Sequence, residues 1–420
     1  MIKADLQWLS DVLGVAPQGK HVDLTNPIGD ICTDSRALVP GQIFLALSGP
    51  NFDGNKFVEQ VTEKGAMAAI VSKPSDADIV QFVVPDTLIA LGQLGKAVRD
   101  VVNPKVIAIT GSVGKTSVKE MCASIMSLKG NVLATNGNFN NQIGVPLTLL
   151  RLEPQHEFAV IEQGANHIGE ISYTTALSQP NVSILNNVAQ AHLEGFGDLD
   201  GVVTAKGEIY EGIKPGGLAV VNGDSAYKQV WLDKLAKHFE TCPGTIVEFG
   251  LSETLLSLPN GMTATDIEIN DLGCATYNLC FQGQSTPIEL AIPGHHNVKN
   301  SMAAAAACLH LGASLTDVQT GLKNMSGVQG RVNLKPVNKR LMVIDDTYNA
   351  NVQSVKAAAD VLANYQGFSM LVLGDMAELG PDARELHEEV GEYALEKGID
   401  KLFSFGVLSQ NCSAVFEKNG

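Results

Sequence analysis

Residues 105–117, with the sequence KVIAITGSVGKTS, predict the fold of the central part of this chain. Apolar β-formers lead into a Thr-Gly pair, and an amphipathic segment begins at Lys115 and Thr116. A strand, a glycine-rich loop and a helix in this order present backbone N–H groups to phosphate oxygens. The strict phosphate-loop motif has glycine where this chain has Ile109, so the match is to a shorter form, T-G-S-x-G-K-T. A plain glycine turn is the alternative, but Lys-Thr after the second glycine favours phosphate binding.

The side chains of this loop indicate ATP as the ligand. Lys115 can bring a positive charge to the outer phosphates, and the Thr116 hydroxyl can ligate the Mg²⁺ that accompanies ATP. The residues predicted to bind ATP here are Gly111, Ser112, Val113, Gly114, Lys115, Thr116 and Ser117.

Composition and charge exclude several classes of protein. The chain of 420 residues has a formal charge of −16, which argues against a nucleic-acid partner. No apolar run is long enough to span a membrane, and no basic start precedes an apolar stretch, so we expect no signal peptide. Seven cysteines without C-x-x-C spacing favour a reducing cytoplasm over disulfides or a zinc site.

Alternating strand-like and helical segments predict an α/β protein of three domains. Residues 1–84 form a small α/β domain, and residues 85–327, which begin with a connecting helix at 87–102, form a doubly wound parallel sheet. Residues 328–420 repeat β-α-β-α-β in a Rossmann-like pattern. A small antiparallel sheet attached to the central domain is expected from three segments of alternating polarity: 264–270, 275–281 and 286–292.

Polar residues gather after strand ends, where open α/β sheets bind ligands. Glu162 ends a strand and, near a phosphate loop, is a plausible Mg²⁺ ligand. His192 follows another strand, although a lone histidine is more often a hydrogen-bonded structural residue. Lys206 lies in a helical stretch, where a lysine is normally solvated.

Four further residues suit the recognition of a nucleotide. Arg331, at the start of the third domain, is suited to clamp a transferring phosphoryl group from across a cleft. Asp346 follows a strand and could hold ribose hydroxyls. Asn297 and Asn300 stand one turn apart at a helix start, where they either cap the helix or read an adenine edge.

These clusters occur in an order that resembles the Mur ligases, the ATP-dependent amide-bond-forming enzymes of peptidoglycan assembly. The resemblance runs along the whole chain and is carried by DSR (34–36) with PGQIFLALSG (40–49), TNGNFNNQIGVPLTLL (135–150), EQGANHIGEI (162–171), NNVAQAHLEGFG (186–197), AKGEIY (205–210), PGHHNVKNSMAAAA (293–306), DDTYNANVQS (345–354) and LGDMAELG (373–380). Asn55 and Val352 depart from the His and Pro of many relatives, and neither belongs to the expected ATP site.

The resemblance implies a role for each candidate residue. Lys206 would be carbamylated and would bind Mg²⁺ as an oxygen ligand. Two Mg²⁺ ions would be held by Thr116, Glu162, His192 and the Lys206 carbamate. Catalysis would depend on Lys115, Lys206, His192, Glu162 and Arg331. Adenine would contact Asn297 and Asn300, and the uridine-diphosphate group would lie at Ser35, Arg36, Asn138 and Asn141.

Within this family, the QGANHIGEI and YNAN segments favour a ligase that joins D-alanyl-D-alanine to UDP-N-acetylmuramoyl-tripeptide through an acyl phosphate. We expect these two small molecules as its partners and a monomer in the bacterial cytoplasm. Another Mur ligase or a folylpolyglutamate synthase would share the ATP site. Two different classes of protein also stay open: a nucleotide-binding switch or motor ATPase, and a catalytically idle homologue.

The third domain is expected to be shorter than in relatives, which usually continue beyond the strand at 401–406. Because a parallel sheet normally has both faces covered, we expect an apolar face or an open strand edge in this domain. We also expect it to be the least stable part of the chain, with ligase turnover impaired.

Overall fold

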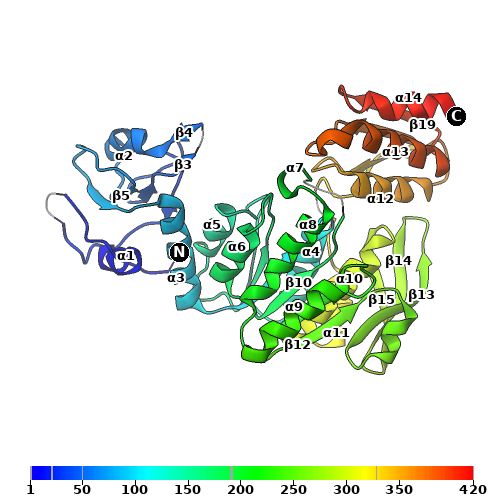
Figure 1. The fold of residues 1–420 in the computed structure, drawn as a ribbon, viewed down its shortest axis with the longest axis horizontal. Helices are drawn as coiled ribbons and strands as arrows, with labels where there is room; N and C mark the ends of the chain where they lie inside the picture. Colours follow the sequence, from blue (N-terminus) through cyan, green and yellow to red (C-terminus); the bar gives the residue numbers. More distant parts are fainter. Residues whose placement is uncertain (1, 20–21, 50, 190–192, 328, 420) are drawn as a thin grey trace.

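A computed structural model describes residues 2–19, 22–49, 51–189, 193–327 and 329–419. Figure 1 shows the chain as three successive units, with the N-terminal unit in blue, the central unit in cyan to yellow, and the third unit in orange to red. Among the described residues, no helix is both long and apolar enough to cross a membrane.

The first domain is a small parallel sheet with short helices beside it. Its four strands pair in the order β1-β2-β5-β6, all parallel, and their buried residues are almost all apolar. The elements are α1 (Leu6–Leu13), β1 (Ile31–Cys32), β2 (Ile43–Leu45), the β3 (Ser48–Gly49) and β4 (Phe52–Asp53) hairpin, a 3₁₀ turn (Gly54–Phe57), α2 (Val58–Glu63), β5 (Ala68–Val71) and β6 (Val80–Val83).

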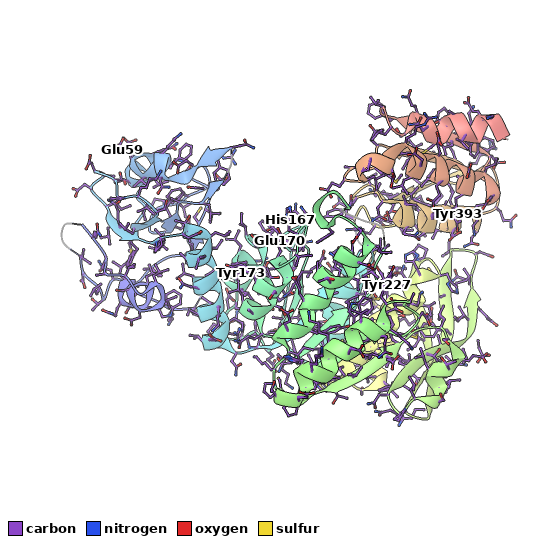
Figure 2. All side chains as sticks on the ribbon, viewed as in Figure 1. Glu59, His167, Glu170, Tyr173, Tyr227 and Tyr393 are labelled. Atoms are coloured by element: carbon purple, nitrogen blue, oxygen red, sulfur yellow. The ribbon has the colours of Figure 1, made fainter. Side chains whose placement is uncertain are left out.

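The helix α3 (Thr87–Val102) joins the first domain to the central one, over the range that the sequence predicts. The Asp86 carboxylate accepts the Leu88 and Ile89 N–H groups and so caps its first turn. Leu91 and Leu94 of α3 belong to one apolar cluster with both domains. Tyr173, labelled in Figure 2, donates its hydroxyl to the Leu88 carbonyl at 3.4 Å. The first domain is therefore packed onto the central one through this helix.

The central domain is built on one nine-stranded sheet in the order β15-β14-β13-β12-β11-β10-β7-β9-β8. Its strands are β7 (Lys105–Thr110), β8 (Val132–Ala134), β9 (Phe158–Glu162), β10 (Val182–Leu185), β11 (Leu218–Asn222), β12 (Thr245–Phe249), β13 (Gly261–Ile269), β14 (Cys274–Phe281) and β15 (Gln284–Pro293). Its helices are α4 (Lys115–Met126), α5 (Gly144–Leu149), α6 (Glu170–Ser178), α7 (Leu193–Phe196), α8 (Leu199–Gly207), α9 (Lys228–Thr241), α10 (His296–His310) and α11 (Leu315–Lys323), with 3₁₀ turns at Glu208–Gly212 and Glu253–Ser257.

Helices cover both faces of this sheet, as expected for a doubly wound domain. On one face, Ile107 and Ile109 of β7 pack in a cluster with apolar residues of α4, α10 and α11. On the other face, Ala108 belongs to a cluster with residues of α6, α8 and α9. Because β7 lies inside the sheet and is buried on both faces, it holds the loop that follows it in a rigid frame.

The three antiparallel strands that the sequence predicts are present, but they extend the main sheet. β13 pairs in parallel with β12 through Glu248–Gly261 and Phe249–Met262, and then in antiparallel with β14. The long β13 therefore belongs to both parts, which alternation of polar and apolar residues alone does not reveal.

The third domain places its helices on one side of short strands. It contains β16 (Asn333–Asn338), β17 (Leu341–Asp345), α12 (Val352–Ala363), β18 (Met370–Gly374), a 3₁₀ turn (Gly380–Asp382), α13 (Ala383–Glu396), β19 (Lys401–Phe405) and α14 (Gln410–Asn419). β16 and β17 form an antiparallel hairpin, and β18 pairs in parallel with β19. The sequence predicts β17, α12, β18, α13 and β19, and it misses β16.

One face of the β18–β19 pair is apolar and exposed, as the sequence predicts for this domain. Leu373 and Leu402 point into a cluster with residues of α12, α13 and α14. On the opposite face, Val372 stands beside Phe403 in the strand register, and Phe405 is 85% exposed.

Candidate active site

The phosphate loop follows β7 in a conformation that its two glycines permit. Gly111 and Gly114 have φ angles of 152° and 79°, in the left-handed region that side chains disfavour. A Cβ at Gly114 would lie 2.7 Å from the Asn186 Nδ2 and 2.7 Å from the Asn300 Oδ1. The glycines are therefore required by the backbone and by the close approach of two amides. Helix α4 begins directly afterwards, at Lys115, and directs its N-terminus to the loop.

Lys115 folds back over the loop that precedes it. Its Nζ donates to the Gly111 carbonyl at 2.8 Å and lies 3.5 Å from the Ser112 carbonyl. Burial lowers the pKa of Lys115, the Arg331 charge lowers it further, and the Glu162 charge opposes both. The ammonium is thus pre-positioned at the loop, where phosphate oxygens would replace its carbonyl partners.

Glu162 and Thr116, two candidates for the cation site, meet beside the loop. The Thr116 hydroxyl donates to the Glu162 Oε2 at 3.0 Å, and the Asn140 Nδ2 donates to the Oε1 at 2.9 Å. Glu162 is buried at the carboxyl end of β9, next to β7. Asn140 was not predicted, although the candidates Asn138 and Asn141 flank it in sequence.

Lys206 is buried, whereas a lysine in a helical stretch is normally solvated. It lies in α8, 2% exposed, with its Nζ 5.5 Å from the Phe196 ring centroid. Burial lowers the pKa of Lys206 to about 7, and the positive charge of Lys115 contributes to the same shift. Glu170, labelled in Figure 2 at the start of α6, acts in the opposite direction. A buried lysine that is partly neutral at pH 7 is a reactive amine.

The predicted ligand His192 lies outside the described residues. Within the part of the chain that the structure describes, no group of three or more His, Cys, Asp or Glu side chains gathers as a metal site. The oxygen atoms of Glu162 and Thr116 nevertheless fit a hard cation such as Mg²⁺, because phosphate oxygens and water commonly complete its coordination.

A chain of buried amides connects α10 to the phosphate loop. Asn186, after β10, donates to the Asn300 Oδ1 at 2.8 Å and to the Val113 carbonyl at 3.1 Å. Asn300 donates to the Asn297 Oδ1 at 2.8 Å, and Asn297 donates to the Pro293 carbonyl. The amides predicted for adenine thus also hold the loop in place.

Asn187 forms two hydrogen bonds to the same loop at Val113. Its Oδ1 accepts the Val113 N–H and its Nδ2 donates to the Val113 carbonyl, both at 2.9 Å. Neither Asn186 nor Asn187 was predicted as a site residue. Their position at the carboxyl end of a strand beside β7 was the signal that could have identified them.

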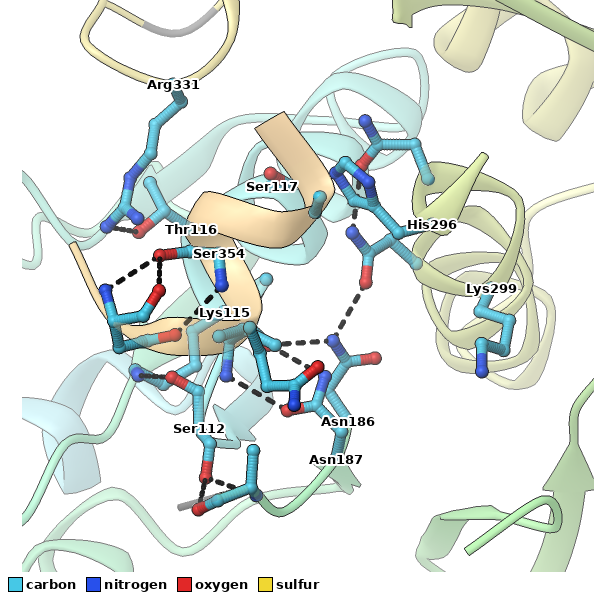
Figure 3. Close-up of a pocket in the computed structure, with 18 of the residues that line it drawn as sticks. Ser112, Lys115, Thr116, Ser117, Asn186, Asn187, His296, Lys299, Arg331 and Ser354 are labelled. Carbon is cyan, nitrogen blue, oxygen red and sulfur yellow. Dashed lines mark hydrogen bonds between the residues drawn. The ribbon is translucent and has the colours of Figure 1, made fainter. Parts of the chain in front are cut away.

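A cavity of about 630 Å³ lies between the loop and the third domain (Figure 3). Arg331 enters it from the third domain, and its Nη2 lies 3.4 Å from the Thr116 Oγ1. Asp346 also lines the cavity, and burial raises its pKa. The loop residues Ser112 to Ser117, Asn297 and Asn300 also line it, so the structure brings these predicted ATP-binding residues together.

His296 and Lys299 line this cavity and were not predicted. Burial lowers the pKa of His296 to about 4, and the imidazole is therefore neutral at pH 7. Lys299 brings a positive charge from the first turns of α10, 3.8 Å from the Asp224 carboxylate. Both residues lie in the segment 293–306, in which the sequence predicts Asn297 and Asn300 as site residues.

The four residues predicted for the uridine-diphosphate group come from two domains. Ser35 is buried, and the exposed Arg36 pairs with the Asp34 carboxylate at 2.8 Å, which lowers the pKa of Asp34 to about 2. Asn138 is exposed, and the Asn141 Oδ1 caps the start of α5. A second cavity, of about 600 Å³, lies between these domains and is lined by their sequence neighbours Ala37 and Phe139.

Three family models match successive parts of the chain. The model described as "Mur ligase family, catalytic domain" matches residues 27–129, "Mur ligase middle domain" matches residues 109–308, and "Mur ligase, glutamate ligase domain" matches residues 330–418. The middle-domain match begins inside β7 and includes the phosphate loop.

Individual relatives agree with these matches. A UDP-N-acetylmuramoyl-tripeptide–D-alanyl-D-alanine ligase of Escherichia coli is 43% identical over 98% of this chain and 88% of its own length. A crystal structure of MurF from Acinetobacter baumannii is similar with a TM-score of 0.91 and 39% identity, over 98% of this chain and 87% of its own. The fold is also that of MurF from Thermotoga maritima in complex with ADP, with a TM-score of 0.76 and 23% identity over 93% of this chain and 97% of its own.

Proposed function

The chain belongs to the Mur ligase family, and we propose that it uses ATP to join D-alanyl-D-alanine to UDP-N-acetylmuramoyl-tripeptide. The observation that supports this most strongly is the contact between Arg331 of the third domain and Thr116 of the phosphate loop. Together with Lys115, this contact brings cations from two domains to one point, next to Glu162, where a γ-phosphate would leave ATP.

The first step transfers the γ-phosphoryl group of ATP to the free carboxylate of the UDP-linked tripeptide, which yields ADP and an acyl phosphate. Two anions have to approach each other in this step, and their repulsion must be offset. Lys115 and Arg331 supply positive charge at the loop, each from its own domain. The loop N–H groups and the N-terminus of α4 add fixed dipoles of the same sign.

In the second step, the amine of D-alanyl-D-alanine attacks the acyl carbon. The tetrahedral intermediate expels phosphate, and the nitrogen loses a proton to give the amide. The cavity between the central and third domains shields the acyl phosphate from water when substrates fill it. Phosphate is thus released only when an amine has reacted.

Glu162 and Thr116 would hold Mg²⁺ in this site, and the resemblance adds His192, a Lys206 carbamate and a second ion. Mg²⁺ would neutralise the charge that develops on the phosphates. Lys206 is suited to carbamylation because its buried amine is partly neutral at pH 7. A neutral amine adds CO₂ and releases a proton, and the product is a carbamate with two oxygen ligands.

The cellular setting is part of the same proposal. We infer the reducing cytoplasm of a bacterium from the sequence, whose seven cysteines lack the spacing of a disulfide framework or a zinc site. The uridine-diphosphate group would bind between the first and central domains, at Ser35, Arg36, Asn138 and Asn141. That assignment and the monomeric state remain predictions.

Phosphate release in the presence of UDP-N-acetylmuramoyl-tripeptide, with and without D-alanyl-D-alanine, tests the function. We expect release to require both substrates, with the ligated pentapeptide as product. Lys115→Ala should abolish ligation without altering the circular dichroism spectrum, because the hydrogen bonds of the Lys115 Nζ to described residues go to loop carbonyls. Lys129→Ala is the matched control, since this lysine is exposed beyond the end of α4.

Competing functions predict different outcomes of the same assay. Phosphate release without any amine would indicate an ATPase, and turnover with a single amino acid in place of the dipeptide would indicate a different Mur ligase. An absence of turnover in the presence of bound nucleotide would indicate an idle homologue. Retention of more than a few per cent of ligation by Lys115→Ala would refute the assigned site.

A further inference from the structure

Tyr348 is a large aromatic residue with no place in the core or in the nucleotide cavity. It belongs to the YNAN segment, is 47% exposed, and does not line the cavity that its neighbour Asn349 lines. Asn351, at the end of the same segment, has a defined role, because its side chain caps α12 through the Ser354 N–H. The ring of Tyr348 therefore requires a separate explanation.

The ring of Tyr348 is stacked on the guanidinium of Arg331. The Arg331 Cζ lies 4.2 Å from the centroid of the Tyr348 ring. At this distance the negative face of an aromatic ring attracts a guanidinium and restricts its orientation. The Nη2 of the same guanidinium donates to the Thr116 hydroxyl of the phosphate loop. The ring therefore packs against the guanidinium that contacts this loop.

The backbone on both sides of Arg331 is tied to the same strand-end loop. The Tyr348 N–H donates to the Gly330 carbonyl at 3.2 Å, and a Cβ at Gly330 would lie 3.2 Å from the Tyr348 Cβ. The Val332 N–H donates to the Asp346 Oδ1 at 3.1 Å. Gly330 and Val332 both have positive φ angles, of 69° and 45°. A β-branched residue rarely adopts such an angle unless its surroundings impose it.

The Arg331 side chain itself has few other restraints. Its Nε is buried and has no hydrogen-bond partner within the described residues, and its contact with Thr116 is long at 3.4 Å. An arginine with one weak hydrogen bond would otherwise sample several rotamers. The stacked ring is thus the main contact that orients this guanidinium before the nucleotide is bound.

We propose that Tyr348 is a positioning residue that holds the Arg331 guanidinium at the phosphate loop, ready to meet the transferring phosphoryl group. Because Arg331 enters the reaction only under the proposed function, Tyr348 has this role only if that function is right. Tyr348 does not line the nucleotide cavity, and in this proposal it acts through Arg331.

Tyr348→Leu removes the ring and keeps a side chain of moderate size. We expect kcat for ligation to fall by roughly three- to thirtyfold, from the range of cation–π energies. KM for D-alanyl-D-alanine should stay within about twofold, because the dipeptide does not contact the guanidinium in this scheme. Tyr348→Phe keeps the ring and should restore most of the lost turnover.

Tyr393→Leu is the matched control in the same domain. The Tyr393 ring, labelled in Figure 2, is also stacked on cations, with the Lys356 and Lys397 Nζ atoms 4.9 and 5.0 Å from its centroid. Tyr393 does not line the cavity. Tyr393→Leu should lower the melting temperature of the domain without lowering kcat. Equal losses of kcat in the two variants would overturn the proposal, since they would indicate a general loss of domain stability.

A double-mutant cycle with Arg331→Ala separates positioning from any independent role. Affinity for Mg²⁺ and AMPPNP, measured by calorimetry, provides a readout when turnover is too slow. Tyr348→Leu should weaken AMPPNP binding in the wild-type background and leave it unchanged when Arg331 is absent. The same loss in both backgrounds, or no loss in either, refutes the role of Tyr348. Wild-type ligation by Arg331→Ala would instead contradict the assigned function of Arg331.

Discussion

Gly114→Ala tests whether the amide chain behind the phosphate loop sets nucleotide affinity. Gly114 has a φ angle of 79°, and an added Cβ would lie 2.7 Å from atoms of both Asn186 and Asn300. The methyl group therefore introduces backbone strain and also pushes apart two buried amides. Those amides join α10 to the loop at Val113.

The free-energy costs of the backbone strain and of the displaced amides can be estimated separately from the structure. An alanine in the left-handed region costs about 1–2 kcal/mol wherever it occurs. Displacing Asn186 breaks its hydrogen bonds to Asn300 and Val113, each of which contributes about 1 kcal/mol. If this second cost of about 2 kcal/mol falls on the binding conformation of the loop, affinity for ADP drops by about thirtyfold.

Gly216→Ala supplies the control for backbone strain alone. Gly216 has the same φ angle of 79°, and a Cβ there would meet no atom within 4 Å. Calorimetric titration with Mg²⁺ and ADP should show wild-type affinity for Gly216→Ala and a loss of about thirtyfold for Gly114→Ala. Thermal melts should show that backbone strain lowers the melting temperature of both variants by a similar amount. Wild-type affinity in Gly114→Ala would refute the view that this amide chain holds the loop.

Two further predictions concern the helix that carries Lys206. Because burial lowers the pKa of Lys206 from 10.5 to about 7, the unfolded chain binds a proton there between those pH values and the folded chain does not. The free energy of unfolding should therefore rise with pH in this window. Between about pH 7 and pH 9 it should rise by about 2 kcal/mol more in wild type than in Lys206→Met. Urea unfolding without bicarbonate measures the difference, and parallel pH curves would contradict the low pKa. Trp231, 1% exposed, packs against Gly207 and donates its Nε1–H to the Val203 carbonyl at 3.2 Å. Trp231→Ala should cost about 3–5 kcal/mol in calorimetric unfolding, and Trp231→Phe much less; equal melting temperatures of the two variants would show that the cavity collapses.

The sequence alone predicted most elements of the central and third domains and the position of the phosphate loop. The run from Lys105 to Ser117 contains its own signals, because a buried strand, a glycine turn and a lysine-threonine pair are local in sequence. The helix at 87–102 and the strand ending at Glu162 were predicted for the same reason. Periodicity and turn residues encode short-range geometry, and the structure reproduces it.

Only the tertiary structure decided which of these residues meet. A lysine in a helical stretch is normally solvated, and the burial of Lys206, with its Nζ 5.5 Å from the Phe196 ring centroid, is visible only in the structure. Asn186 and Asn300 are more than a hundred positions apart and meet because α10 packs on the sheet beside β10. The stack of Tyr348 on Arg331, and the approach of Arg331 to Thr116, depend on how the third domain docks against the central one. Such contacts arise from long-range packing, which no local pattern in the chain encodes.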